Sequence, residues 1–124
     1  MMTRRVLPLC FMVITAAFAA LSLSSALSAQ TATQCGDASW YAIRNTTASG
    51  EMMNPDALTA AHRTLPFGTM VNVLNRDNGE ELTLRINDRG PFISGRIIDV
   101  SRAAANQLGF RTAGVADVCL TIMS

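Results

Sequence analysis

Several residue types are scarce in this 124-residue sequence. It has no lysine, so all ten cationic residues are arginine, and it has one histidine, one tryptophan and one tyrosine. Only 15% of the residues are charged and the net charge is +1. These values exclude an acidic disordered chain and provide no basic surface for nucleic acid. We therefore expect a small globular protein that does not bind nucleic acid.

Motifs of cofactor and metal chemistry are also missing. The sequence contains no glycine-rich phosphate-binding loop, no Gly-x-Ser-x-Gly nucleophile motif and no histidine pair spaced to hold a metal ion. Nucleotide chemistry and metal chemistry are therefore not expected. The sequence predicts neither a metal site nor a cofactor.

The N-terminal segment has the layout of a secretory signal peptide. Arg4 and Arg5 precede an apolar stretch of 13 residues, Leu9 to Leu21, which is followed by small residues. This stretch is shorter than the roughly 20 residues that a membrane-spanning helix needs. We predict a leader over residues 1–29, cleaved between residues 26 and 32, and a periplasmic or secreted product without a stable membrane anchor. Cys10 lies inside the apolar stretch and does not fit a lipoprotein cysteine.

Removing these 29 residues from the 124 leaves 95 residues, with eight arginines against nine acidic residues and a net charge of −1. Two cysteines remain, Cys35 and Cys119, and they are 84 positions apart. In an oxidising compartment we expect them to form a disulfide, which would stabilise so small a domain; two unpaired buried thiols are the alternative. Neither cysteine has the spacing of a zinc ligand.

Alternating apolar residues predict strands in the remaining chain. Leu82, Leu84 and Ile86 alternate with polar residues, and Val71 and Val73 share one face of the preceding segment. The Asn78-Gly79 pair between them is typical of a hairpin turn. We predict further strands over residues 38–43, 58–62, 96–100 and 116–123.

One short helix is predicted over residues 102–108, because Ser101 can cap its first turn and Gly109 can end it. Six short strands with one helix favour a mainly β fold, and closure into a small barrel would leave no exposed sheet edge. We expect a single barrel domain over residues 35–124.

Asp88 is the leading candidate for chemistry, because it lies where a predicted strand runs into a Gly-Pro loop. A turn residue paired with Arg85 or Arg89 is the alternative. A lone histidine such as His62 is more often structural, and Glu51, in a loop of small residues, is as readily a solvated side chain.

Asp99 has a structural interpretation, namely a hydrogen bond to the start of the following helix. Trp40 and Tyr41 are adjacent in a predicted strand and so project to opposite faces. They could stack on a sugar, although a place in the barrel core is the simpler interpretation of Trp40.

Several strings in order resemble the RlpA (rare lipoprotein A) family. They are ASWY (38–41), TASGE (47–51), TAAHRTLPFGT (59–69), RINDRGPF (85–92) and GRIIDVSRAAA (95–105). The resemblance implies a double-psi β-barrel and a periplasmic lytic transglycosylase that acts on peptidoglycan glycan strands, preferring strands stripped of stem peptides.

The resemblance also implies roles for particular residues. Asp88 and His62 match the residues tied to activity, and Glu51 matches a glutamate that lines the same groove. We expect Asn87, Arg89 and Tyr41 to contact the glycan as well.

The sequence departs from the family pattern in places. Ala42 stands where the family commonly has glycine, and the segment 42–46 is shorter than usual, which would reshape one wall of the groove. No lipid-anchor cysteine and no C-terminal peptidoglycan-binding repeat domain are found. Recruitment to the division site would then depend on the barrel or on division-site or cell-wall proteins. We expect a monomer.

Lytic cleavage needs an acid that protonates the leaving oxygen and a base that takes the proton of the muramoyl C6 hydroxyl. One carboxyl group can do both in sequence, and Asp88 is predicted to do so, with His62 orienting it or a sugar hydroxyl. The flanking Arg85 and Arg89 favour an ionised carboxylate, which opposes the acid role. Direct hydrolysis would need a second carboxyl, for which Glu51 and Asp99 are available. A non-catalytic, expansin-like wall-binding module is the rival interpretation.

Overall fold

The computed structural model describes residues 32–123, which form six strands and one helix. The predicted leader, residues 1–29, and Cys10 lie outside the described residues. The elements are β1 (Thr33–Tyr41), β2 (Thr59–Ala61), β3 (Met70–Asn75), β4 (Glu81–Asp88), β5 (Arg96–Ser101), α1 (Arg102–Leu108) and β6 (Val115–Ile122). The predicted fold class, a mainly β chain with one short helix, is confirmed.

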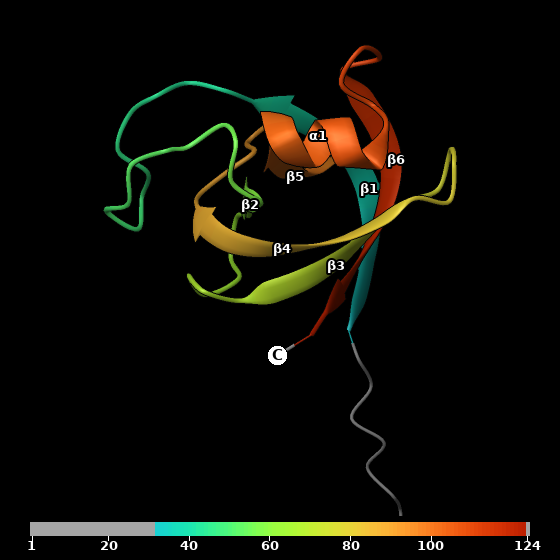
Figure 1. Cartoon of the computed structure of the whole chain (residues 1–124). Coiled ribbons are helices and arrows are strands. Elements are labelled where there is room, and N and C mark those ends of the chain that lie inside the picture. The colour runs from blue at the N-terminus through green and yellow to red at the C-terminus, as the bar shows by residue number, and fades with distance from the viewer. Residues whose placement is uncertain (1–31, 124) are drawn as a thin grey trace, which may run out of the picture.

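The six strands close into a barrel in the order β1-β5-β2-β4-β3-β6 (Figure 1). Two neighbouring pairs are parallel, β1 with β5 and β2 with β4, and the other four pairs are antiparallel. Parallel neighbours finish at the same end of a sheet. The pair β2 and β4 runs opposite to the pair β1 and β5, because β2 is antiparallel to β5. The register places Ala61, the last residue of β2, against both Asp99 and Asp88. The chain between β1 and β2 loops out on one side of the barrel (Figure 1).

The hairpin predicted at Asn78-Gly79 joins β3 to β4. Its turn is wider than two residues, because the Asn75 backbone N–H donates to the carbonyl of Glu80 at 2.8 Å, and Gly79 has a φ of 78°. Val71, Val73, Leu84 and Ile86 are buried, as the alternation predicts. The period-2 pattern therefore identifies both strands and the faces that they bury.

Helix α1 has the predicted bounds and caps. The Ser101 hydroxyl accepts from the Ala104 N–H at 3.2 Å, and Gly109 is left-handed at φ 76°. The positive φ of Gly109 favours glycine, and a β-carbon there would lie 2.7 Å from the Asn78 side-chain nitrogen, which would have to move. The Asn78 amide donates to the Leu108 carbonyl at 2.9 Å and ties the end of the helix to the β3–β4 turn.

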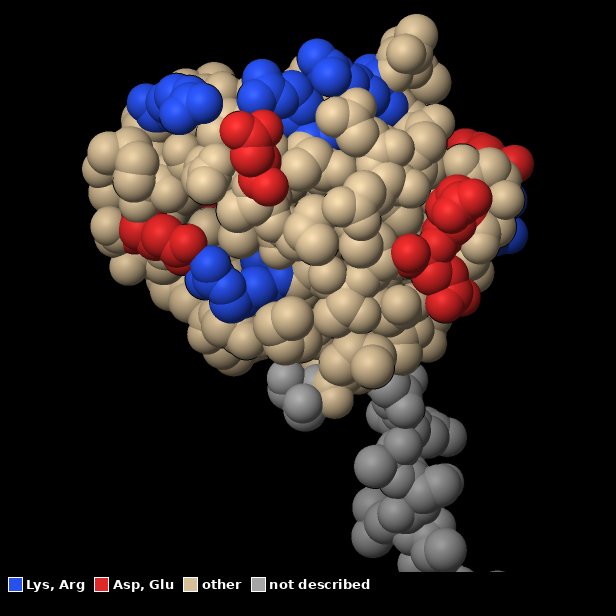
Figure 2. All heavy atoms as spheres, in the orientation of Figure 1, with Lys and Arg blue, Asp and Glu red and all other residues tan. Residues whose placement is uncertain are grey.

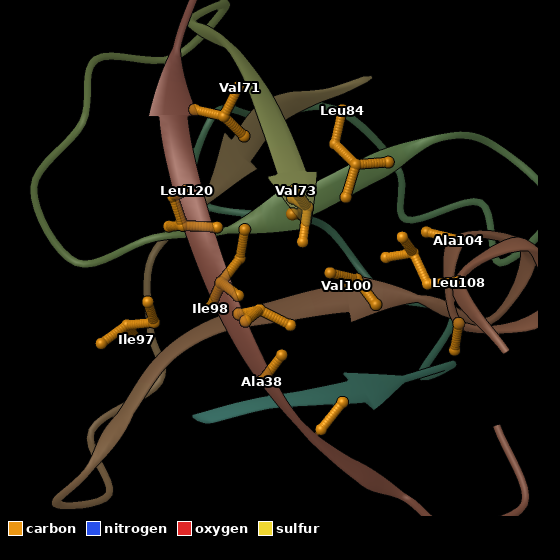
Figure 3. Packing of buried hydrophobic residues seen from close by; sticks show 14 of the residues in the cluster. Ala38, Val71, Val73, Leu84, Ile97, Ile98, Val100, Ala104, Leu108 and Leu120 are labelled. Carbon is orange, nitrogen blue, oxygen red and sulfur yellow. The ribbon is translucent and has the colours of Figure 1, made fainter. Parts of the chain in front are cut away.

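The core fills the barrel and the interface with α1 (Figure 3). Trp40 is partly buried and packs against this core, as predicted, while its indole N–H donates to the Arg111 carbonyl at 3.0 Å. The buried apolar residues of this core cluster are Ala38, Ala60, Val71, Val73, Leu84, Ile86, Ile97, Ile98, Val100, Ala104, Ala105, Leu108, Phe110, Ala116, Val118 and Leu120.

Strand β1 differs from its predicted bounds of 38–43. It begins at Thr33 and ends at Tyr41, and its first residues are exposed. They form a strand because they pair with β6 from Thr33↔Thr121 to Ser39↔Val115. The hydrogen-bonded ladder, and not an apolar pattern, therefore creates the first half of β1.

The predicted disulfide is present in this ladder. Cys35 and Cys119 are direct partners in the β1–β6 pairing, and their sulfur atoms are bonded. The bond closes a loop across 84 positions, which encloses most of the barrel. It therefore joins the first strand to the last.

Replacing both Cys35 and Cys119 with serine should leave the barrel folded but lower its free energy of unfolding. The chain-entropy estimate for a loop of this length is about 4 to 5 kcal/mol, and strain in the native bond reduces it. Urea unfolding of the two proteins measures the difference. A reductant should destabilise the wild type and leave the double variant unchanged; equal stability of the two proteins without reductant would contradict the expected role.

Candidate active site

A cleft of about 300 Å³ lies beside the last residues of β1, β2 and β4. Tyr41, Ala61 and Asp88, the last residues of β1, β2 and β4, all line it. Ile43, Asn45, Arg89 and Asp99 complete the lining. The topology therefore concentrates the polar strand ends in one depression.

The Asp88 carboxyl accepts three hydrogen bonds. Its Oδ2 accepts from the Tyr41 hydroxyl at 3.0 Å, and its Oδ1 accepts from the backbone N–H groups of Ala48 and Arg89, each at 2.9 Å. These contacts hold the carboxyl in a fixed orientation. The predicted candidates Asp88 and Tyr41 are thus brought together, with Arg89 beside them in the cleft lining.

The Tyr41 phenol remains protonated in this setting. Burial raises the pKa of Tyr41 well above its ordinary value, and the nearby carboxylates of Asp88 and Asp99 raise it further. Tyr41 therefore acts as a hydrogen-bond donor and not as a base.

The two arginines that flank Asp88 in the sequence have other partners. Arg85 forms a two-pronged ion pair with Glu51 at 2.7 and 2.8 Å. Arg89 donates to the backbone carbonyls of His62 at 3.2 Å and Leu65 at 2.8 Å, and its guanidinium lies 4.1 Å from the Phe67 ring centre. Neither side chain is hydrogen-bonded to the Asp88 carboxyl, because backbone carbonyls and Glu51 take up their donors.

Glu51 lies beside the cleft and does not line it. Its hydrogen bonds from Arg85 are the main cause that holds the pKa of Glu51 below its ordinary value, so it is an anion. Both partners are about 41% exposed, and a pair at that exposure contributes little to stability. Glu51 is predicted to line the groove, but it is not among the residues that line the cleft.

The loop of residues 46–52 is fastened over the end of β4. A bridge between Thr46 and Met52 closes it, and the Ser49 N–H donates to the Asn87 carbonyl at 3.3 Å. The Glu51–Arg85 ion pair also attaches the loop to β4. Because this loop carries the Ala48 N–H, its attachments position one of the donors to Asp88.

Asn87 is predicted to contact the glycan, but its side chain points into the protein. It is 1% exposed, and its Oδ1 is buried with no hydrogen-bond partner among the described residues. A direct glycan contact by Asn87 is thus not available in this arrangement.

His62 is also separated from the cleft. Its ring is 6% exposed, and its Nδ1 accepts from the backbone N–H groups of Thr64 and Leu65, both at 3.1 Å. The proton is therefore on Nε2, which donates to the Gln34 Oε1 at 2.9 Å. The hydrogen bond between His62 and Asp88 is a backbone one, from the His62 N–H to the Asp88 carbonyl at 3.1 Å. The expected contact of the ring with the Asp88 carboxyl is absent, because Ala61 faces the cleft and its neighbour faces away.

Asp99 lies in the cleft and not at the start of α1. Its Oδ1 accepts a hydrogen bond from the Ser39 hydroxyl on the adjacent β1, and Ser101 caps the helix instead. The prediction of a bond from Asp99 to the helix start was wrong, because Asp99 and Ser39 are direct partners in the parallel β1–β5 ladder. Sequence reasoning also missed Ile43 and Asn45, whose loop has no distinguishing motif.

The described residues contain no group of three or more histidine, cysteine, aspartate or glutamate side chains placed to hold a metal ion. Within the same residues, no helix is both long enough and apolar enough to cross a membrane.

A family model described as "Lytic transglycolase" matches residues 33–120. The chain belongs to this family. Together with the closed six-stranded barrel, this identifies an RlpA-family double-psi β-barrel. The match begins with β1 and ends within β6, so it spans the whole barrel.

Curated members of the family are similar at the sequence level. "Probable endolytic peptidoglycan transglycosylase RlpA" of Synechocystis sp. is 54% identical over 91 residues, which are 71% of this chain and 28% of that protein. "Endolytic peptidoglycan transglycosylase RlpA" of Neisseria meningitidis is 52% identical over 89 residues, which are 69% of this chain and 37% of that protein. The chain thus spans about a third of the length of these relatives.

Two solved structures share the fold at low identity. The Streptomyces papain inhibitor has a TM-score of 0.63 and 20% identity, over 75% of this chain and 96% of the inhibitor. The apo expansin of Clavibacter michiganensis has a TM-score of 0.61 and 21% identity, over 75% of this chain and 51% of the expansin. At these identities they show the barrel alone.

The contacts of His62 indicate that its Nδ1 atom stabilises the barrel as a hydrogen-bond acceptor. Replacing His62 with alanine leaves two backbone N–H groups without their acceptor and should cost about 1 to 3 kcal/mol of unfolding free energy. Asparagine places an oxygen near the Nδ1 position, so His62→Asn should recover most of this loss. Urea unfolding of the three proteins tests the order; an asparagine variant as unstable as the alanine variant would contradict it.

The same residue makes stability depend on pH. Burial, with smaller contributions from Arg63 and Arg89, lowers the pKa of His62 from its ordinary value of 6.5. The unfolded chain then binds a proton more readily than the folded one, so stability falls as the pH drops below about 6.5. His62→Asn should lack this part of the decrease between pH 7 and pH 5, as measured by unfolding at each pH.

Proposed function

We propose that this barrel is an endolytic peptidoglycan lytic transglycosylase. It cleaves the bond between N-acetylmuramic acid and N-acetylglucosamine in glycan strands and leaves 1,6-anhydro ends. The observation that carries the proposal is the Asp88 carboxyl, oriented in the cleft by three donors, in a chain of the lytic transglycolase family. The names of its relatives support the same reaction.

The reaction breaks the bond from muramoyl C1 to the bridging oxygen and forms a bond from O6 to C1. The C6 hydroxyl loses its proton to a base, and the bridging oxygen gains one. Asp88 is the base, because donors on both of its oxygens fix a carboxylate that can accept the C6 proton. No water molecule is consumed, so a second carboxyl to activate water is not required.

The cleft suits a sugar chain. It combines Tyr41 and Asn45 with the exposed apolar side chain of Ile43, and sugars present both polar edges and apolar faces. On the face in Figure 2, charged side chains are separated by broad uncharged areas. The family pattern favours strands without stem peptides as the substrate.

The remaining predictions belong to the same proposal. A domain over residues 35–124, a cleaved leader and a periplasmic or secreted location fit an enzyme of the cell wall. Asp88 is the proposed catalytic residue, with Tyr41 and Arg89 beside it. His62 and Glu51 act as positioning residues, through the turn that holds Arg89 and through the loop that holds Ala48.

Product analysis tests the proposal. Wild-type protein incubated with peptide-free glycan strands should release fragments that end in 1,6-anhydro-N-acetylmuramic acid, detected by mass spectrometry. Only reducing-end products would mean hydrolysis, and binding to sacculi without soluble product would favour the expansin-like wall-binding alternative.

Asp88→Asn should lower the rate of cleavage by a factor of about 100 or more, since an amide cannot take the C6 proton. The amide oxygen can still accept from Ala48 and Arg89, so the fold should persist, which circular dichroism checks. Asp37→Asn is the matched control, because Asp37 is an exposed residue of β1 outside the cleft lining. Full activity of Asp88→Asn would remove Asp88 from this role.

A further inference from the structure

A second carboxyl faces the cleft across one strand from Asp88. Ala61, at the end of β2, pairs with Asp88 on β4 and with Asp99 on β5. All three residues line the cleft. Neighbouring strands are about 4.8 Å apart, so the two aspartates sit about 9 to 10 Å apart at the backbone, with the small side chain of Ala61 between them. A sugar residue lying over Ala61 would have a carboxyl on each side.

The two carboxyls have different hydrogen-bond partners. Asp88 accepts from three groups, of which two are backbone N–H groups that can only donate. Among the described residues, the Asp99 carboxyl has one hydrogen-bond partner, the Ser39 hydroxyl. A hydroxyl can donate or accept, so it satisfies Asp99 as a carboxylate and as a carboxylic acid. Asp99 can therefore carry a proton and keep its hydroxyl partner, whereas Asp88 already accepts from three donors.

Electrostatic repulsion also acts between the two carboxyls. Two carboxylates that share a cleft resist simultaneous ionisation, and the effect grows when a bound glycan displaces water. Both charges act on Tyr41, whose pKa they raise, so both carboxyls face the same space. Of the two, Asp99 has fewer fixed donors.

Glu51, the other carboxylate considered for the site, is not placed to act as the second carboxyl of the cleft. Both of its oxygens accept from Arg85, and it is outside the cleft lining. Of the carboxyls among the described residues, the cleft lining contains those of Asp88 and Asp99.

We propose that Asp99 is a second catalytic residue, the general acid that protonates the leaving oxygen. The inference rests on the proposed transglycosylase activity. The proton of Asp99 moves to the bridging oxygen as the bond from C1 breaks, O6 bonds to C1, and the O6 proton moves to Asp88. The products are an anhydro end and a free hydroxyl, and solvent exchange then returns a proton to Asp99 and removes one from Asp88.

A substrate with a good leaving group separates this role from the others. The probe is a peptide-free oligosaccharide whose terminal N-acetylmuramic acid carries 4-nitrophenol at C1, because nitrophenolate departs without a proton. Asp99→Asn should cut glycan strands about 100-fold or more slowly than wild type but release nitrophenol within about tenfold of the wild-type rate. Asp88→Asn should lose both activities, and Asp37→Asn neither.

The wild type supplies an independent measurement if Asp99→Asn does not fold. Cleavage of strands should decline on the alkaline side as the acid loses its proton, whereas release of nitrophenol should not decline there. The ionisable groups lining the cleft with Asp99 are Tyr41, Asp88 and Arg89. A base such as Asp88 would produce an acid-side decline with both substrates, so the alkaline difference reports the acid.

The outcomes separate the two proposals. A wild type that makes no anhydro ends overturns the transglycosylase activity and the Asp99 role with it. Anhydro ends from the wild type together with an unimpaired Asp99→Asn variant overturn the Asp99 role alone. An equal loss on strands and on the nitrophenyl probe, or identical alkaline profiles, also overturns it, since the residue would then act by position.

Discussion

Closure of the barrel through β1 is the constraint on which the other features depend. This strand pairs antiparallel with β6 on one side and parallel with β5 on the other, and the Cys35–Cys119 bond reinforces the β6 side. The registers of the β1–β5, β5–β2 and β2–β4 pairs place the last residues of β1, β2 and β4 near Asp99 of β5. Tyr41, Ala61 and Asp88 meet for this reason, although they are far apart in the sequence.

The orientation of Asp88 depends mainly on backbone groups. Two of its three donors are the N–H groups of Ala48 and Arg89, so the loop that carries Ala48 matters more than the side chain at that position. Glu51 fastens this loop through Arg85, and the His62 ring shapes the turn whose carbonyls hold Arg89. Residues that do not face the cleft thus affect its geometry through the groups that they hold in place.

Local patterns in the sequence predict most of the fold and only part of the site. The β3–β4 hairpin and the caps of α1 depend on neighbouring residues, and both are found as predicted. The motif around Asp88 identifies its carboxyl, but nothing local shows that Asp99 pairs with Ala61 across another strand, since that contact arises from barrel closure. His62 shows the same limit, because neighbouring positions of a strand point to opposite faces. A side chain that lines the cleft and one that points away from it therefore differ by a single position. Which face a short strand such as β2 presents is set by its neighbours, and three residues carry too little alternation to reveal it.

The partners of the arginines decide the electrostatic character of the cleft. In the sequence, Arg85 and Arg89 surround Asp88 and would be expected to neutralise it. In the fold, Arg85 is paired with Glu51, and Arg89 is directed to backbone carbonyls and the Phe67 ring. The aspartates therefore face the cleft without a cation bonded to Asp88. Cleavage of a glycosidic bond develops positive charge at C1 and the ring oxygen, so a carboxylate such as Asp88 facing the cleft stabilises the transition state more than the ground state, which is the condition for catalysis.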